Sequence, residues 1–93
     1  MNKTFSNDLF NKMPIVGIMR DVSGGHAEIL AKLYSEAGLT CLEVTMNSAD
    51  APGSIEKLAG LYGDVLNIGA GTVCSMHDLE AALKANAQFI VTP

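Results

Sequence analysis

Basic side chains are scarce in this chain, and they are not clustered. Six Lys and Arg residues stand against ten Asp and Glu residues, which gives a formal net charge of −4. Proteins that bind nucleic acids concentrate positive charge on one face or along one helix. The composition therefore argues against a nucleic-acid partner, although a small anion site built around one guanidinium remains compatible with it.

Long apolar runs and cysteine clusters are also missing. No stretch approaches the roughly 20 residues that cross a bilayer, and the N-terminus lacks the pattern of a signal peptide. We therefore expect a cytoplasmic chain with no membrane partner. The two cysteines, Cys41 and Cys74, have neither the framework of a disulfide protein nor a metal-ligand spacing. We expect reduced thiols and no metal site.

What the chain does contain is an alternation of strand-like and helix-like segments. Short apolar runs bounded by Gly, Pro or Asn predict buried strands, and residues with three- and four-residue apolar spacing predict helices between them. The expected segments are a leading helix at 4–12, strands at 15–19, 41–45, 66–70 and 89–92, and helices after Gly25, at 52–61 and at 76–85. This order favours parallel βα units over hairpins.

Four βα units make up half of a (β/α)8 barrel, which needs eight units and about 250 residues. We therefore predict an α/β fold that forms the N-terminal (βα)4 portion of a TIM barrel. Its parts are a leading helical segment at 1–12 and an incomplete first half-barrel at 13–93. Such a portion leaves strand edges and an apolar inner face uncovered.

Glu43 is the residue in this pattern that most directly suggests chemistry. It places a carboxylate inside an otherwise apolar strand, where an ionised group is costly to bury without a partner. Alternate residues of a barrel strand point inward, so Cys41, Glu43 and Thr45 should share the inner face. Two interpretations stay open from spacing alone: a proton-transfer group, or a structural carboxylate paired with an Arg of a neighbouring strand.

Two other strand ends carry candidate ligand-binding groups. Arg20 ends the first strand, where its planar guanidinium suits a carboxylate or phosphate; the alternative is a surface residue that pairs with Asp21 or caps a helix. The segment Gly69-Ala70-Gly71-Thr72 joins a strand to a helix and would let backbone amides approach a ligand, although tight turns use the same pattern. It lacks the third Gly of a dinucleotide fingerprint and the Lys of a phosphate loop.

Four motifs in this order and spacing resemble one enzyme family. They are IVGIMR at 15–20, LEVTMNS at 42–48, GAGTV at 69–73 and QFIVTP at 88–93. From about residue 13 onward the chain is similar to the 2-dehydro-3-deoxy-phosphogluconate (KDPG) and 4-hydroxy-2-oxoglutarate (KHG) aldolases. The resemblance implies a (β/α)8 barrel, usually a homotrimer, that needs no cofactor or metal and cleaves a keto-deoxy-phosphosugar acid to pyruvate and an aldehyde.

The resemblance also implies roles for particular residues. In this family a lysine amine condenses with the C2 ketone of the substrate, and a carboxylate moves the protons. Glu43 matches that catalytic carboxylate. Thr72 matches the Thr that contacts the pyruvate carboxylate, and Pro93 matches the Pro that closes the fourth strand.

One position departs from the gluconate-type pattern. Many gluconate-type members have a substrate-binding Arg four residues after the catalytic Glu, where this chain has Asn47 followed by Ser48. The Asn-Ser pair, together with Arg20 at the end of the first strand, resembles the phosphogalactonate (KDPGal) branch. We therefore expect Arg20 to supply the guanidinium and Asn47 to contact the substrate.

The Schiff-base lysine of this family lies on the sixth strand, beyond residue 93. No lysine of this chain ends a predicted strand, so we expect an N-terminal fragment without appreciable aldolase activity of its own. Two alternatives stay open. The chain could be a non-catalytic half-barrel that pairs its open edges with another copy, as a binding or structural module, or part of a phosphosugar isomerase-like barrel.

Overall fold

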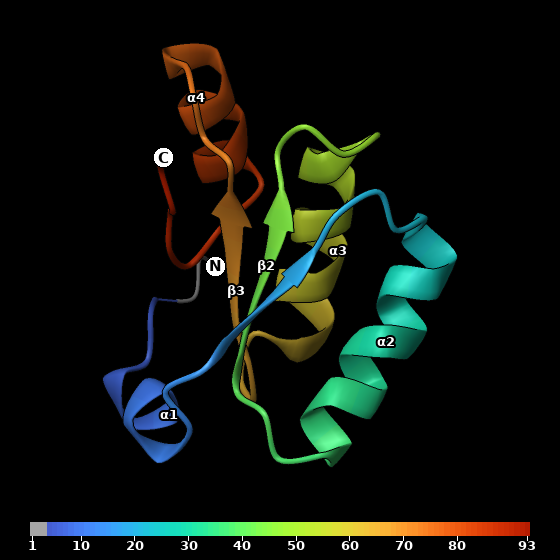
Figure 1. The fold of residues 1–93 in the computed structure, drawn as a ribbon, viewed down its shortest axis with the longest axis vertical. Coiled ribbons are helices and arrows are strands. Elements are labelled where there is room, and N and C mark those ends of the chain that lie inside the picture. Colours follow the sequence, from blue (N-terminus) through green and yellow to red (C-terminus); the bar gives the residue numbers. More distant parts are fainter. Residues whose placement is uncertain (1–3) are drawn as a thin grey trace.

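The computed structural model describes residues 4–93, and a three-stranded parallel sheet in the order β1-β2-β3 forms its centre. Helices α2 and α3 lie side by side along one face of this sheet (Figure 1). No helix in the described part of the chain has the length and apolarity to cross a membrane. The elements are α1 (Asn7–Lys12), β1 (Val16–Met19), α2 (Gly24–Glu36), β2 (Cys41–Thr45), α3 (Ala51–Tyr62), β3 (Asn67–Gly71) and α4 (Met76–Lys84).

The side chains of β2 alternate between the two faces as predicted. Leu42 and Val44 join the apolar core on the helix-covered face, and Glu43 and Thr45 line a cavity on the other face. The core is completed mainly by aliphatic residues of α3, of β3 and of the position just before β3, which are Ile55, Leu58, Leu66, Ile68 and Ala70. Alternation within a fully buried strand thus directs the carboxylate of Glu43 away from the core.

Local signals explain where the helices begin and end. The Ser75 hydroxyl accepts a hydrogen bond from the Asp78 amide at 3.1 Å and so caps the N-terminus of α4. Gly38 and Asn86, which follow α2 and α4, have φ values of 90° and 68°, in the left-handed region that Gly and Asn adopt most readily. Gly24, expected to precede α2, is instead its first residue.

The predicted strand at 89–92 is reduced to an isolated bridge between Ala70 and Ile90. The segment does run parallel to β3, since Ala70 donates to the Phe89 carbonyl at 3.0 Å. One step earlier, however, the Ile68 amide donates to the side chain of Gln88, at 2.8 Å. The side-chain oxygen of Gln88 therefore accepts the hydrogen bond that a backbone carbonyl would accept in a regular ladder, and the strand does not extend.

The segment around α1 covers the N-terminal end of the strands (Figure 1). The fully buried Asn67 side chain accepts a hydrogen bond from the Ser6 amide at 2.7 Å and donates to the Ser6 carbonyl at 2.9 Å. The Thr40 hydroxyl donates to the Leu9 carbonyl at 2.6 Å. This leading segment is thus hydrogen-bonded to the bottom of the sheet; its first three residues lie outside the described residues.

Candidate active site

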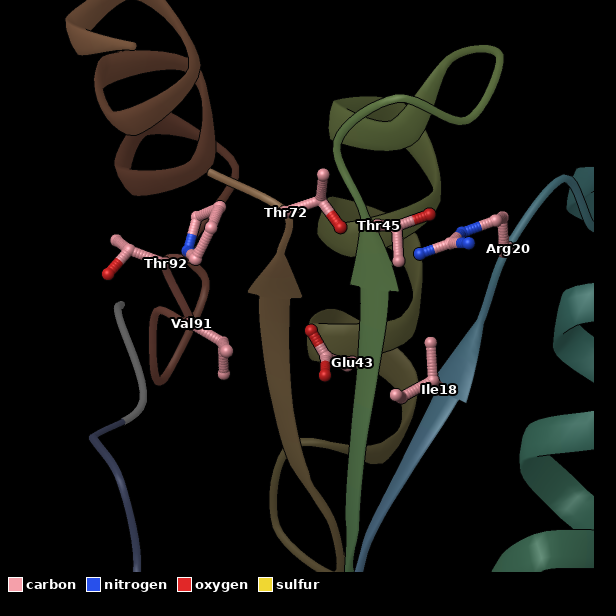
Figure 2. Close-up of a pocket in the computed structure, with 8 residues that line it drawn as sticks. Ile18, Arg20, Glu43, Thr45, Thr72, Val91 and Thr92 are labelled. Carbon is pink, nitrogen blue, oxygen red and sulfur yellow. The ribbon is translucent and has the colours of Figure 1, made fainter. Parts of the chain in front are cut away.

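A cavity of about 230 Å³ lies at the C-terminal ends of the strands (Figure 2). This is the end at which parallel barrels place their active sites. Its lining residues come from β1, β2 and the segments that follow β1, β3 and α4: Ile18, Arg20, Glu43, Thr45, Thr72, Val91, Thr92 and Pro93.

Four of the five site residues predicted from the sequence line this cavity together: Arg20, Glu43, Thr72 and Pro93. They come from positions as far apart as 73 residues in the sequence, and the parallel sheet brings them to one edge. Asn47 is not among the lining residues; it is exposed in the turn after β2. The cavity therefore gathers the charged and hydroxyl groups that the motifs indicated and leaves Asn47 at its periphery.

Glu43 lies in the middle of β2 and is 5% exposed. Burial raises the pKa of its carboxyl above the usual range, and the positive charge of Arg20 opposes part of this rise. Within residues 4–93 the two side chains form no direct salt bridge, so Arg20 acts on the carboxyl through its charge and not through a hydrogen-bonded pair. A carboxyl whose pKa is moved toward neutrality is suited to both accepting and releasing a proton.

Arg20 follows β1 and is exposed at the cavity mouth. Figure 2 shows its guanidinium directed toward Thr45 on the neighbouring strand. Among the described residues it forms no ion pair with Asp21, the partner that the alternative interpretation required. The guanidinium is therefore available for an anionic group that enters the cavity.

A chain of hydroxyl groups holds the residue after Arg20. The Ser48 hydroxyl accepts a hydrogen bond from the Asp21 amide at 2.9 Å and lies 2.8 Å from the Thr45 hydroxyl. Asp21 itself has a φ of 56°, so its backbone occupies the left-handed region. Sequence reasoning did not identify Thr45 as a cavity residue or Ser48 as its hydrogen-bonding partner; only the inward parity of Thr45 pointed to the site.

Replacing Ser48 by Ala is expected to destabilise the chain by about 1–3 kcal/mol, because the Asp21 amide and the Thr45 hydroxyl lose a shared partner. Urea unfolding of the two proteins measures this difference. Ser35→Ala removes a hydroxyl from the half-buried last turn of α2 and should change the free energy of unfolding by less than about 0.5 kcal/mol. Equal effects of the two substitutions would contradict a bridging role for Ser48.

Thr72 follows β3 with its backbone in the left-handed region, at a φ of 53°. This conformation costs an L-residue roughly 1–2 kcal/mol, and a β-branched residue seldom adopts it. Hydrogen bonds on both sides hold it there: Met46 donates to the Gly71 carbonyl at 2.8 Å, and Val73 donates to the Val91 carbonyl at 3.2 Å. Strained residues of this kind cluster at functional sites, and this one presents its hydroxyl at the cavity (Figure 2).

Amines and metal ligands do not gather at this cavity in the described part of the chain. No lysine lines it, and Lys57, for example, pairs with Glu28 at 2.9 Å on the outer helices. No three His, Cys, Asp or Glu side chains within 4–93 are placed to share a metal ion. Cys41 is buried and Cys74 exposed, both as free thiols. The groups present can move a proton and bind an anion.

Residues 7–93 match the family model described as KDPG and KHG aldolase. The chain is 33% identical over 82 residues to the 2-dehydro-3-deoxy-6-phosphogalactonate aldolase of Escherichia coli K12, a match that covers 88% of this chain and 40% of the relative. It is 39% identical over 83 residues to the 2-dehydro-3-deoxy-phosphogluconate aldolase of Pseudomonas aeruginosa, covering 87% and 35% respectively.

Solved structures agree with these relatives. The KDPG aldolase of Legionella pneumophila, crystallised with pyruvate captured as a covalent carbinolamine, superposes with a TM-score of 0.82 at 28% identity. The match covers 91% of this chain and 41% of that one. The three parallel strands and their helices thus match the N-terminal portion of an aldolase barrel, and the chain spans 35–40% of the length of the two curated relatives. By sequence and by structure, this chain belongs to the KDPG and KHG aldolase family.

Proposed function

We propose that this chain supplies the proton-transfer part of a class I aldolase site that cleaves a 2-dehydro-3-deoxy-6-phospho-sugar acid to pyruvate and an aldehyde. The observation that carries the proposal is the buried Glu43 carboxyl, with its raised pKa, in one cavity with Arg20 and Thr72. The amine that forms the Schiff base belongs to the later half of the barrel in this family. The 93-residue chain therefore holds the carboxylate and lacks the electron sink.

The proposed chemistry divides between these groups. When a lysine holds the substrate as an iminium, the C3–C4 bond breaks as a base removes the proton of the C4 hydroxyl, and its electrons form an enamine. Glu43 accepts that proton and later returns one to C3, which gives bound pyruvate. The guanidinium of Arg20 and the hydroxyl of Thr72 hold the substrate carboxylate.

The substrate we favour is the phosphogalactonate type. Support comes from Asn47 and Ser48 after β2, from Arg20 at the end of β1, and from the E. coli relative named for 2-dehydro-3-deoxy-6-phosphogalactonate. Ser48 contributes through the backbone of Asp21, which it holds beside Arg20. Phosphogluconate and 4-hydroxy-2-oxoglutarate are the competing substrates of the same family.

A chimeric barrel tests the proposal. The whole 93-residue chain is joined to the part of the E. coli phosphogalactonate aldolase that follows its matched segment, and pyruvate release is followed for all three substrates. We expect cleavage, fastest with 2-dehydro-3-deoxy-6-phosphogalactonate. A chimera that has the circular dichroism of a folded barrel and releases pyruvate from none of the three would contradict the proposal.

The 93-residue chain alone provides the matched negative control. With pyruvate and borohydride it should acquire no covalent label, because no lysine within residues 4–93 lines the cavity. The chimera should be labelled once, on the lysine of its later half. A label on a lysine of the short chain would show that the amine need not come from elsewhere.

The open edge of β1 favours a second candidate function, a self-associating half-barrel. Ile15 and Ile18 are 53% and 63% exposed there, and Leu30 and Leu33 of α2, which line a groove with Ile18, are 44% and 56% exposed. A second copy would offer the matching open edge at the segment after α4. Sedimentation velocity separates the two candidates, since a stable dimer of the short chain supports the module and a monomer excludes it.

A further inference from the structure

Three glycines of the sheet lie where another side chain occupies the space that a Cβ atom would fill. At Gly17 this space holds the phenol of Tyr34, and at Gly69 it holds the ring of Phe89. At Gly71, the last residue of β3, it holds the Glu43 carboxylate: a Cβ there would overlap Oε2 and lie 2.5 Å from Cδ. No side chain at position 71 is compatible with the Glu43 carboxylate in its present place.

The requirement for glycine at this position comes from space and not from backbone conformation. Gly38 is the glycine with positive φ in the described chain, and Gly71 is paired regularly with Thr45 in the parallel ladder. An L-residue could therefore adopt the backbone of Gly71 without strain. What excludes it is the carboxylate, which lies across the end of β3 at the same level as the cavity.

The neighbouring residues explain why the carboxylate is found there. Glu43 is paired with Ile18 on one side and with Gly69 on the other. The apolar side chain of Ile18 fills the β1 side, as Figure 2 shows. On the β3 side Gly69 and Gly71 have no side chains of their own, and because the Phe89 ring covers Gly69, the carboxylate lies over Gly71. The carboxylate is thus directed toward β3 and the hydroxyl of Thr72, and away from direct contact with Arg20.

We propose that Gly71 is a positioning residue for Glu43, and that its missing side chain fixes where the carboxylate lies in the cavity. The catalytic consequence rests on the proposed aldolase function, but the position of the carboxylate does not. In Gly71→Ala the new methyl group displaces the carboxylate from β3 into the open part of the cavity. Solvent reaches it there and removes part of the burial that raises its pKa.

Carboxyl-carbon NMR of the 93-residue chain, labelled at Glu, tests this inference directly. In the unsubstituted chain Glu43 should titrate above the ordinary glutamate range. In Gly71→Ala its midpoint should move down toward that range. The matched control is Gly25→Ala in α2, where a Cβ atom would meet no other atom within 4 Å; it should leave the Glu43 midpoint in place.

A second variant keeps the inference falsifiable if Gly71→Ala folds poorly. Glu43→Asp shortens the side chain by one methylene and withdraws the carboxylate from the new methyl group. The double variant should therefore have a higher thermal midpoint than Gly71→Ala alone. An unchanged Glu43 titration in Gly71→Ala, or a double variant no more stable than that single variant, would overturn the proposal. An inactive chimera would instead count against the aldolase proposal and leave these measurements as they stand.

Discussion

Glu43→Gln in the chimeric barrel is expected to lower kcat for sugar-acid cleavage by about 10²- to 10⁴-fold, the range that a positioned general acid-base contributes. The amide has nearly the same size as the carboxyl and still fits the space above Gly71, so folding should persist. It cannot accept the C4 hydroxyl proton. Initial rates of pyruvate release, measured over a range of substrate concentrations, give kcat and KM separately.

The matched control for this substitution is Glu56→Gln, the same change at an exposed position of α3. It should leave kcat within experimental error of the unsubstituted chimera. If Glu43→Gln retained most of the activity, Glu43 would be a structural residue and the proton would move through another group.

The pH dependence of the stability of the 93-residue chain tests Glu43→Gln independently of catalysis. Burial raises the pKa of Glu43 in the folded state, so folding favours its protonated form. The contribution of this group to stability is fully present below the pKa of an unfolded glutamate and is lost as pH rises through the folded pKa. Glu43→Gln removes that dependence, and its advantage over the unsubstituted chain should therefore grow from acid to neutral pH in urea unfolding.

Asn67→Ala is expected to destabilise the chain by about 3 kcal/mol, the upper part of the range for buried polar groups left without partners. Asn67 is fully buried at the bottom of β3 and hydrogen-bonds both backbone groups of Ser6. Its amide also lies 3.4 Å from the Cys41 sulfur. Its loss releases the leading segment from the sheet, which urea unfolding measures as a lower midpoint.

Asn47→Ala provides the comparison for Asn67, because the same residue type is exposed in the turn after β2. It should change the free energy of unfolding by less than about 0.5 kcal/mol. Amide exchange at Ser6 adds a local test, since Asn67→Ala should speed exchange there before it affects the core. Unchanged stability and unchanged Ser6 exchange would mean that α1 does not close the sheet.

Much of the fold follows from local pattern. β2 was predicted at its observed bounds, because it is an apolar run with one carboxylate between two turns. The later helices differ by a residue or two at their ends, and the leading helix, predicted at 4–12, begins three residues later, at Asn7. The segment at 89–92 was overestimated as a strand because its outcome depends on Gln88, whose side chain bonds the Ile68 amide across a separation of 20 residues. Sequence composition does not indicate that a side chain 20 residues away will replace a backbone carbonyl as the acceptor for the Ile68 amide.

The sequence predicts which side chains of a strand face the cavity, because they alternate along the strand. It does not predict which residues pair across neighbouring strands. Parity alone placed Glu43 at the inner face, and strand ends indicated Arg20 and Thr72. The role of Gly71 requires knowing that Glu43 pairs with Gly69, so that its side chain reaches one step further along β3. The bridge through Ser48 likewise depends on how two turns meet in space.

The central claim, that Glu43 moves the protons of a pyruvate-forming reaction, is tested most directly by hydrogen exchange at the methyl group of pyruvate. The chimera in D2O should replace the methyl protons with deuterium through the enamine, as followed by proton NMR. Glu43→Gln should abolish this exchange while borohydride still traps pyruvate on the lysine at equilibrium. Exchange at an undiminished rate in Glu43→Gln would contradict the claim.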